Sequence, residues 1–208
     1  MVQNIFYLVL GGILTIAGTV FINLLQRRIR KRDFIKGVKT ELRELKHTMA
    51  MIVFKMRHRL GQLEDDLYTF ILPIIEEYQG PEKDQKEIEA SRKLSTLSYE
   101  QRLSLRDAGE IPGKTPRPIM YQLTFIENNL SAVSFLSMDV QRLILQIRQH
   151  LDYFNQQVKF VAAQFDLTFY PDTDHEAINT NLEDGYNTLS KRANFIVEKI
   201  NEFEEISR

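Results

Sequence analysis

Residues 5–25 read IFYLVLGGILTIAGTVFINLL, a run of 21 residues without a charged side chain. A helix of this length reaches about 31 Å, which matches the hydrocarbon core of a bilayer. Buried helices of soluble proteins seldom extend this far without a charge. We therefore interpret residues 1–26 as a transmembrane anchor.

The flanks of this run predict that the anchor is kept and which way it points. Residues 1–4 carry no basic side chain, and no small-residue cleavage site follows the run, so the pattern of a cleaved signal peptide is missing. Seven Lys and Arg residues lie between positions 27 and 39, against none before the run. Because Lys and Arg near a span stay on the cytoplasmic side, we expect a single-pass protein of the inner or plasma membrane. Its N-terminus faces outward and residues 27–208 lie in the cytoplasm.

Small residues recur at helical spacing inside the run and predict a packing ridge. The ridge consists of Gly11, Thr15, Gly18 and Thr19. Small side chains let two helices approach closely in lipid, where close packing replaces the hydrophobic effect. Two alternatives stay open: the ridge packs against a copy or a partner, or it packs against nothing.

A basic cluster follows the run directly and consists of Arg27, Arg28, Arg30, Lys31 and Arg32. Residues 26–60 hold 12 Lys and Arg against 3 Asp and Glu, whereas residues 61–208 hold 15 against 25. Polybasic segments beside an anchor are attracted to anionic headgroups by about 1 kcal/mol per charge. Lipid contact therefore explains the charge bias. Without aromatic residues interleaved among the charges, we expect no nucleic-acid partner.

Apolar residues keep heptad-like spacing over most of the remaining chain and predict an all-α fold. We expect a cytoplasmic antiparallel bundle or coiled coil of three to four long helices. They cover residues 33–78, 98–108, 119–169 and 174–206, with a polar connector at 79–118. No helix breaker stands between the anchor and residue 33, so anchor and first helix are expected to form one rod.

Local signals refine these boundaries. Ser98 and Gln101 predict a capping box at the start of the second helix, and Thr173 with Glu176 predicts one for the last. A four-residue stutter between Met56 and Leu60 interrupts the 33–78 repeat, which we interpret as a straightening of the rod, and Gly61 is expected to weaken the helix. Ser137 breaks the 119–169 repeat, and an alternative is that it caps a new helix.

Patterns that carry chemistry are sparse. Glu44 and His47 form one E-x-x-H pair, but di-iron bundles use two, so we interpret it as a solvated helix face. Residues 113–115 (Gly-Lys-Thr) resemble the end of a phosphate-binding loop, but the first glycine is replaced by Ala108 and Pro116 follows. There is no cysteine. We therefore expect no catalytic residue, cofactor or metal, and no enzymatic activity.

These features favour a membrane-anchored adaptor or sensor that presents a helical rod to a protein partner. The alternative is a membrane effector, pore-forming or membrane-disrupting, whose anchors self-associate through the ridge under control of the bundle. The expected partners are the lipid bilayer with its anionic headgroups, together with a protein partner, a second copy of the chain, or both. An enzyme is the third and least favoured hypothesis.

Overall fold

The computed structural model describes residues 2–80, 85–109 and 118–207, and the side chains of residues 2–14, 16, 17, 27 and 85–87 lie outside this description. Every regular element in the described ranges is a helix. This confirms the predicted all-α class and is consistent with a helical bundle. Within the described part of the chain, no helix is both long and apolar enough to cross a membrane. Most side chains of the predicted span, residues 5–25, lie outside that part.

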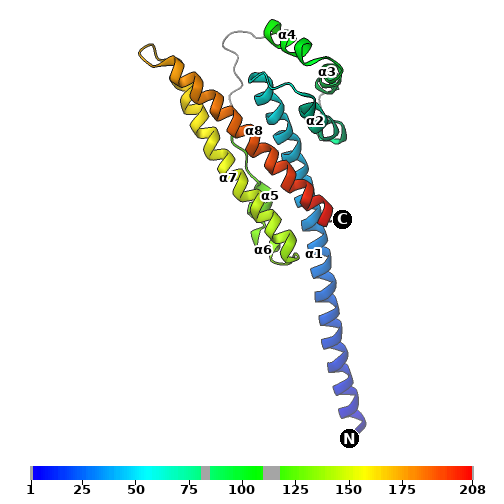
Figure 1. Ribbon diagram of the computed structural model, residues 1–208. Helices are drawn as coiled ribbons and strands as arrows, with labels where there is room; N and C mark the ends of the chain where they lie inside the picture. Colours follow the sequence, from blue (N-terminus) through cyan, green and yellow to red (C-terminus); the bar gives the residue numbers. More distant parts are fainter. Residues whose placement is uncertain (1, 81–84, 110–117, 208) are drawn as a thin grey trace.

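Helix α1 (Val2–Arg59) is one continuous element of 58 residues (Figure 1). It crosses the junction between the apolar run and the basic cluster without interruption, as the missing breaker predicts. Its second half buries a seam of apolar residues at spacings of three and four: Phe34, Val38, Leu42, Leu45, Met49, Ile52 and Met56. Its first half projects from the end of the bundle (Figure 1).

The predicted helix over 33–78 is wrong, because the chain reverses after Arg59. Gly61 adopts a φ of 73°, a left-handed conformation that only glycine takes readily, and α2 (Asp65–Glu77) packs back against α1. The stutter is therefore a turn. The buried residues of α2 are Leu67, Tyr68, Ile71 and Ile75.

Arg57 ties the two sides of this turn together. Its Nη1 lies 2.8 Å from an oxygen of Asp66, and its Nη2 lies 2.8 Å from an oxygen of Glu64. The hydrogen bond from Arg57 holds the pKa of the Asp66 carboxyl below its usual value. Both carboxylates remain largely exposed, so the contacts orient the turn more than they stabilise it.

The connector holds two short helices, α3 (Gln85–Ser95) and α4 (Tyr99–Gly109). The predicted capping box at the start of α4 is confirmed. The backbone N–H of Ser98 donates to Oε1 of Gln101 at 2.9 Å, and the Gln101 N–H donates to Oγ of Ser98 at 3.3 Å. Residues 113–115 of the Gly-Lys-Thr sequence lie outside the described residues.

The predicted single helix over 119–169 is also wrong. The segment forms α5 (Thr124–Asn128), α6 (Leu130–Val133) and α7 (Met138–Leu167). Asn129 ends α5 by donating from Nδ2 to the carbonyl of Phe125 at 2.8 Å, which competes with the helical pattern. Ser137 is the N-cap position of α7, so a new helix begins at this residue as the alternative had it, but the Ser137 side chain makes no capping hydrogen bond.

Helix α8 (His175–Ile206) lies alongside both α1 and α7 and runs antiparallel to them (Figure 1). Its predicted cap is displaced by one residue. Asp174 accepts from the N–H of Ala177 at 3.1 Å, whereas the Thr173 hydroxyl donates to the carbonyl of Tyr170. The main core lies between these three helices, with Phe154 and Phe203 among the largest fully buried side chains.

A buried arginine holds the connector helices on the bundle. Arg102 on α4 is 2% exposed, and its guanidinium lies 4.5 Å over the ring of Tyr68. Its nitrogens donate at 2.6–3.0 Å to the carbonyls of Leu63, Leu94 and Ser95 and to the carboxylate of Asp65. Burial raises the pKa of Tyr68, and the charge of Arg102 opposes this rise. One side chain thus joins α4 to the ends of α2 and α3.

Replacing Arg102 with methionine should release α4. The change keeps apolar bulk but leaves buried carbonyls without a donor, which we expect to cost about 2–3 kcal/mol and to speed amide exchange in α4 roughly 30- to 150-fold. Hydrogen–deuterium exchange of residues 99–109 measures this. The matched control is Arg92→Met, which removes the exposed ion pair of Arg92 with Glu76 at 2.6 Å and should change exchange by about fivefold or less. Equal effects of the two variants would contradict the assigned role.

Candidate functional site

The predicted packing ridge lies on the projecting half of α1, away from the bundle. Thr15 and Thr19 are exposed, and the Thr19 hydroxyl donates to the carbonyl of Thr15 at 2.8 Å within the same helix. A Cβ added at Gly18 would meet no atom within 4 Å. The surroundings of Gly11 lie outside the described residues. The helical backbone places the four positions on one side of α1, and the space beside Gly18 is open.

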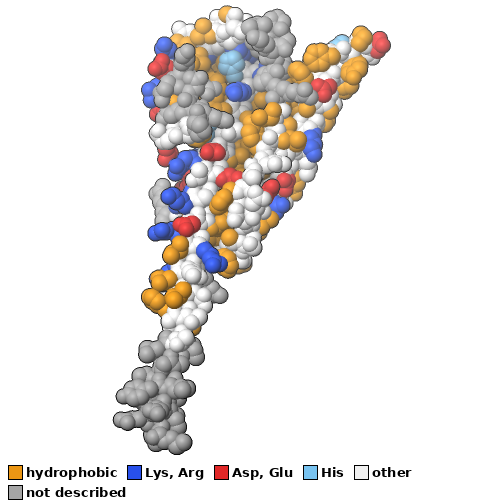
Figure 2. Space-filling view, turned by 180° about the vertical axis from the view of Figure 1, so that it is seen from behind, with side chains coloured by type: hydrophobic (Ala, Val, Ile, Leu, Met, Phe, Trp, Pro, Cys, Tyr) orange, Lys and Arg blue, Asp and Glu red, His pale blue; other side chains and the backbone are white. Residues whose placement is uncertain are grey.

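Large apolar side chains are exposed on the helix just after the ridge. Val20, Phe21, Ile22, Leu24, Leu25 and Ile29 expose 42% to 62% of their surface. Successive residues of a helix point about 100° apart, so these six side chains spread over about 200° of the helix circumference, wider than the stripe that faces a bundle core. Figure 2 shows orange side chains on the projecting stem next to the undescribed grey atoms. The described bundle gives these side chains no apolar cover.

The basic cluster overlaps the end of this apolar stretch at Ile29. Arg28, Arg30, Lys31 and Arg32 are exposed, and the side chain of Arg27 lies outside the description. Arg32 approaches Asp33 at 3.9 Å, but both side chains are more than 60% exposed, so water screens the pair. The cluster therefore keeps most of its charge open to its surroundings.

Part of this cluster continues as a basic stripe along α1. We define the stripe as Arg28, Arg32, Lys36, Lys39, Arg43 and Lys46, which follow one another at spacings of four, four, three, four and three residues. Such spacing places their Cβ atoms on one side of the helix. The apolar seam that includes Val38 and Leu42 faces another direction. The stripe thus runs from the projecting half of α1 to the middle of the bundle.

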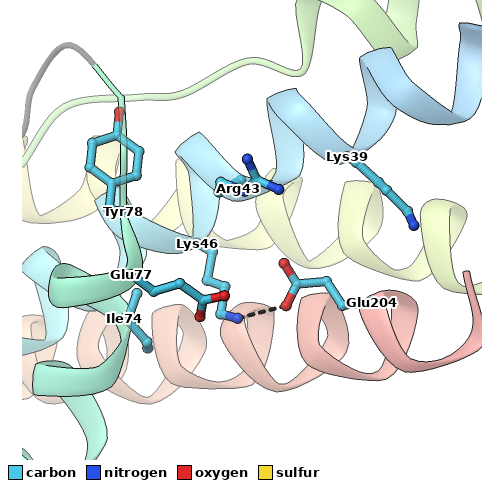
Figure 3. Close-up of a pocket in the computed structure, with 7 residues that line it drawn as sticks. All are labelled: Lys39, Arg43, Lys46, Ile74, Glu77, Tyr78 and Glu204. Atoms are coloured by element: carbon cyan, nitrogen blue, oxygen red, sulfur yellow. Dashed lines mark hydrogen bonds and ion pairs between the residues drawn. The ribbon is translucent and has the colours of Figure 1, made fainter. Parts of the chain in front are cut away.

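The upper half of the stripe, which consists of Lys39, Arg43 and Lys46, lies against the end of α8 (Figure 3). Nζ of Lys39 donates to the carbonyl of Ser207 at 2.6 Å, and Nζ of Lys46 lies 2.7 Å from Oε2 of Glu204. The carbonyl end of a helix carries a partial negative charge, which a lysine stabilises. These contacts fix the C-terminal end of α8 on α1. Arg28, Arg32 and Lys36, in the lower half, are exposed.

A cavity of about 220 Å³ opens beside these contacts, between α1, α2 and α8. Arg43 and Glu77 line it together with Tyr78, and Figure 3 shows their side chains among the lysines and Glu204. Charges of both signs face the cavity, and both of its lysines, Lys39 and Lys46, are already bonded to α8. The arrangement stabilises a junction of three helices and provides no nucleophile activated by a neighbouring base.

The E-x-x-H pair does not form the solvated face that we predicted. His47 is buried and its ring stacks on Tyr78 with centroids 3.9 Å apart, while Glu44 is exposed. The stacking joins α1 to the end of α2. Within the described residues, no group of three or more His, Cys, Asp and Glu side chains is placed to hold a metal ion.

The pKa of His150, on α7, departs from the ordinary value of a histidine. Burial lowers its pKa, and the charges of Arg192 and Lys199 lower it further. Its ring centroid lies 4.2 Å from that of Phe195. The neutral imidazole is therefore favoured as a packing group between α7 and α8.

Two contacts that position α5 against α1 could not be predicted from any local sequence pattern. The carboxylate of Glu41 accepts from the N–H groups of Phe125 and Ile126 at 2.6 and 2.9 Å, and so caps the first turn of α5 from α1. The ring of Phe125 lies directly against Gly37, where any side chain would collide with it. Partners separated by more than 80 residues cannot be paired from spacing alone.

No protein-family model matches the chain, and neither a curated protein nor a solved structure is significantly similar to it.

Proposed function

We propose that the protein is a membrane-anchored adaptor or sensor whose helical bundle is held at the cytoplasmic face by the first half of α1. The observation that carries this proposal is the pair of surfaces on the projecting helix. Exposed apolar side chains cover a broad arc of α1 up to Ile29, and exposed Lys and Arg overlap their end. Burying a large apolar side chain is worth about 1.5–3 kcal/mol, so a helix that exposes six of them between Val20 and Ile29 favours lipid over water.

The continuity of α1 supports an adaptor that presents its bundle in a fixed orientation. The helix that would cross the membrane is the same helix whose residues 34–56 form the core seam. An anchor on a flexible linker would leave the bundle free to tumble. Here any rotation or displacement of the anchor is transmitted directly to α8, which is held by Lys39 and Lys46.

The distal end of the bundle is the surface that we assign to a protein partner. Leu167, Phe169 and Tyr170 at the turn between α7 and α8 are exposed. Aromatic side chains of this kind dominate the energetics of protein interfaces. Helix α7 has 30 residues and holds this end about 45 Å from its own first turn, well clear of a bilayer around the anchor.

The orientation of the chain can be tested directly because it contains no cysteine. A cysteine introduced as Ser207→Cys lies in the bundle, and Asn4→Cys precedes the apolar run. In intact cells, a membrane-impermeant thiol reagent should label Asn4→Cys and leave Ser207→Cys unlabelled until the cells are opened. Labelling of Ser207→Cys alone would show that the orientation is the reverse of the one proposed. Recovery of the chain in the soluble fraction would show that residues 1–26 are not a membrane anchor.

The membrane-effector alternative is favoured by one observation, the open space beside Gly18 on the ridge, where a Cβ would meet no atom within 4 Å. An anchor that must self-associate needs this surface, whereas a passive anchor does not.

Gly11→Leu with Gly18→Leu separates the two hypotheses. The bulky side chains should prevent close approach of two anchors without reducing insertion. For an adaptor we expect no change in activity or in membrane crosslinking, and Leu8→Ile with Leu14→Ile serves as a control for composition. Loss of oligomers together with loss of activity would favour the effector.

A further inference from the structure

We propose that the turn between α6 and α7 is a second membrane contact, which inserts apolar side chains into the interface of the bilayer that holds the anchor. The surface, here called the basal patch, consists of Leu130, Phe135 and Met138, which are 38%, 59% and 77% exposed. The inference rests on the proposed function, because it takes the anchored half of α1 as its reference.

The basal patch lies at the end of the bundle that faces the anchor. Figure 1 shows α6 and the following turn beside the place where the first half of α1 leaves the bundle. The rings of Phe125 and Phe34 stack with centroids 5.8 Å apart, which fixes α5 against α1 at that level. Helix α6 follows α5 and extends farther toward the projecting helix (Figure 1).

The spacing along α1 brings this turn within reach of the bilayer. Phe34, the first buried residue of the seam, follows Leu25 by nine residues, which is about 14 Å along the helix. The headgroup layer occupies roughly 5–8 Å of that distance. The remaining gap is less than about 10 Å, and one turn of helix such as α6 with the loop after it spans a distance of that order.

The exposure of the basal patch is imposed by a turn with a defined structure. Val133 and Leu136, from the same segment, are buried in the core. Nε2 of Gln141 donates to the carbonyl of Leu136 at 2.9 Å, and the Leu136 N–H donates to the carbonyl of Val133 at 3.0 Å. With these residues fixed, Phe135 and Met138 are held outward and do not contribute to the core.

The charges on the part of α1 that leaves this end of the bundle suit a bilayer with anionic lipid, and the acid beside the basal patch, Asp139, is paired with Arg142 at 3.0 Å. The exposed lower half of the basic stripe, Arg28, Arg32 and Lys36, lies on the part of α1 that leaves this end of the bundle. Apolar side chains combined with neighbouring Lys and Arg are the composition of interfacial membrane contacts. The aromatic distal end, by contrast, lies about the length of α7 away. A second contact would fix the tilt of the bundle, which one helix alone leaves free.

A fluorophore at position 137 tests this inference in the full chain. Ser137 is exposed and its side chain makes no capping bond, so Ser137→Cys should not disturb the turn. The labelled protein is reconstituted in vesicles of phosphatidylcholine and phosphatidylglycerol. A nitroxide attached to lipid should quench this fluorophore several-fold more than one at Asp172→Cys in the distal turn. Aqueous iodide should quench them in the opposite order.

Variants of the basal patch provide the matched comparison. Phe135→Ser with Met138→Ser should make the fluorophore at position 137 accessible to iodide, whereas Phe169→Ser at the distal end should leave it in lipid. Equal lipid quenching at positions 137 and 172 would overturn the inference. Protection of position 137 from both quenchers would overturn it as well, because protein would then cover the turn.

A third label separates this inference from the proposed function. Val20→Cys reports on the projecting helix itself, where the native side chain is exposed. Lipid quenching at position 20 but not at position 137 would overturn the second contact and leave the anchor in place. Iodide quenching at position 20 would reject the anchor, and the inference that rests on it would fall too.

Discussion

The burial of one apolar seam of α1 against α8 is the interaction on which the other elements depend. The seam exists only on the second half of the helix, where apolar residues recur from Phe34 to Met56. On the first half, the six exposed apolar side chains between Val20 and Ile29 spread over about 200° of the helix, and the described chain leaves them uncovered. One helix therefore carries two hydrophobic patterns, a stripe that packs in the bundle and a broader apolar arc that the bundle leaves open. The change from one to the other occurs without a break in the backbone.

Lys and Arg side chains lie where these two hydrophobic patterns meet on α1. Cations on the lower part of the basic stripe are exposed, and those on the upper part bind the end of α8 through Lys39 and Lys46. The same residue type thus serves two purposes along one side of α1. Because the Lys46 side chain is largely buried, its pair with Glu204 is less screened by water than the pair of Arg32 and Asp33. We therefore expect salt to screen the exposed pair of Arg32 and Asp33 before it loosens α8.

Local patterns predicted the elements that depend on local interactions. The continuity of α1, the helix over 175–206 and the capping box of Ser98 all follow from propensity, period and capping. The predictions of single long helices over 33–78 and 119–169 were wrong. A heptad-like repeat can continue across a turn when the segments on both sides of the turn face one core, so the repeat alone does not reveal the turn. Gly61, as a residue able to reverse the chain, was the signal available for the first turn. Contacts such as Arg102 with Leu63 and Glu41 with Phe125 join distant segments, so the sequence offers no spacing from which to find them.

The central claim is that anchor and bundle share one rigid helix, and a distance across their junction tests it most directly. Spin labels at Leu25→Cys and Lys55→Cys, both exposed positions of α1, are separated by 30 residues and should give a single narrow distance near about 45 Å in reconstituted vesicles. Pulsed dipolar spectroscopy measures this distribution in the full chain. A broad distribution, or one centred well below that value, would show a hinge between the basic cluster and the bundle and would contradict the account.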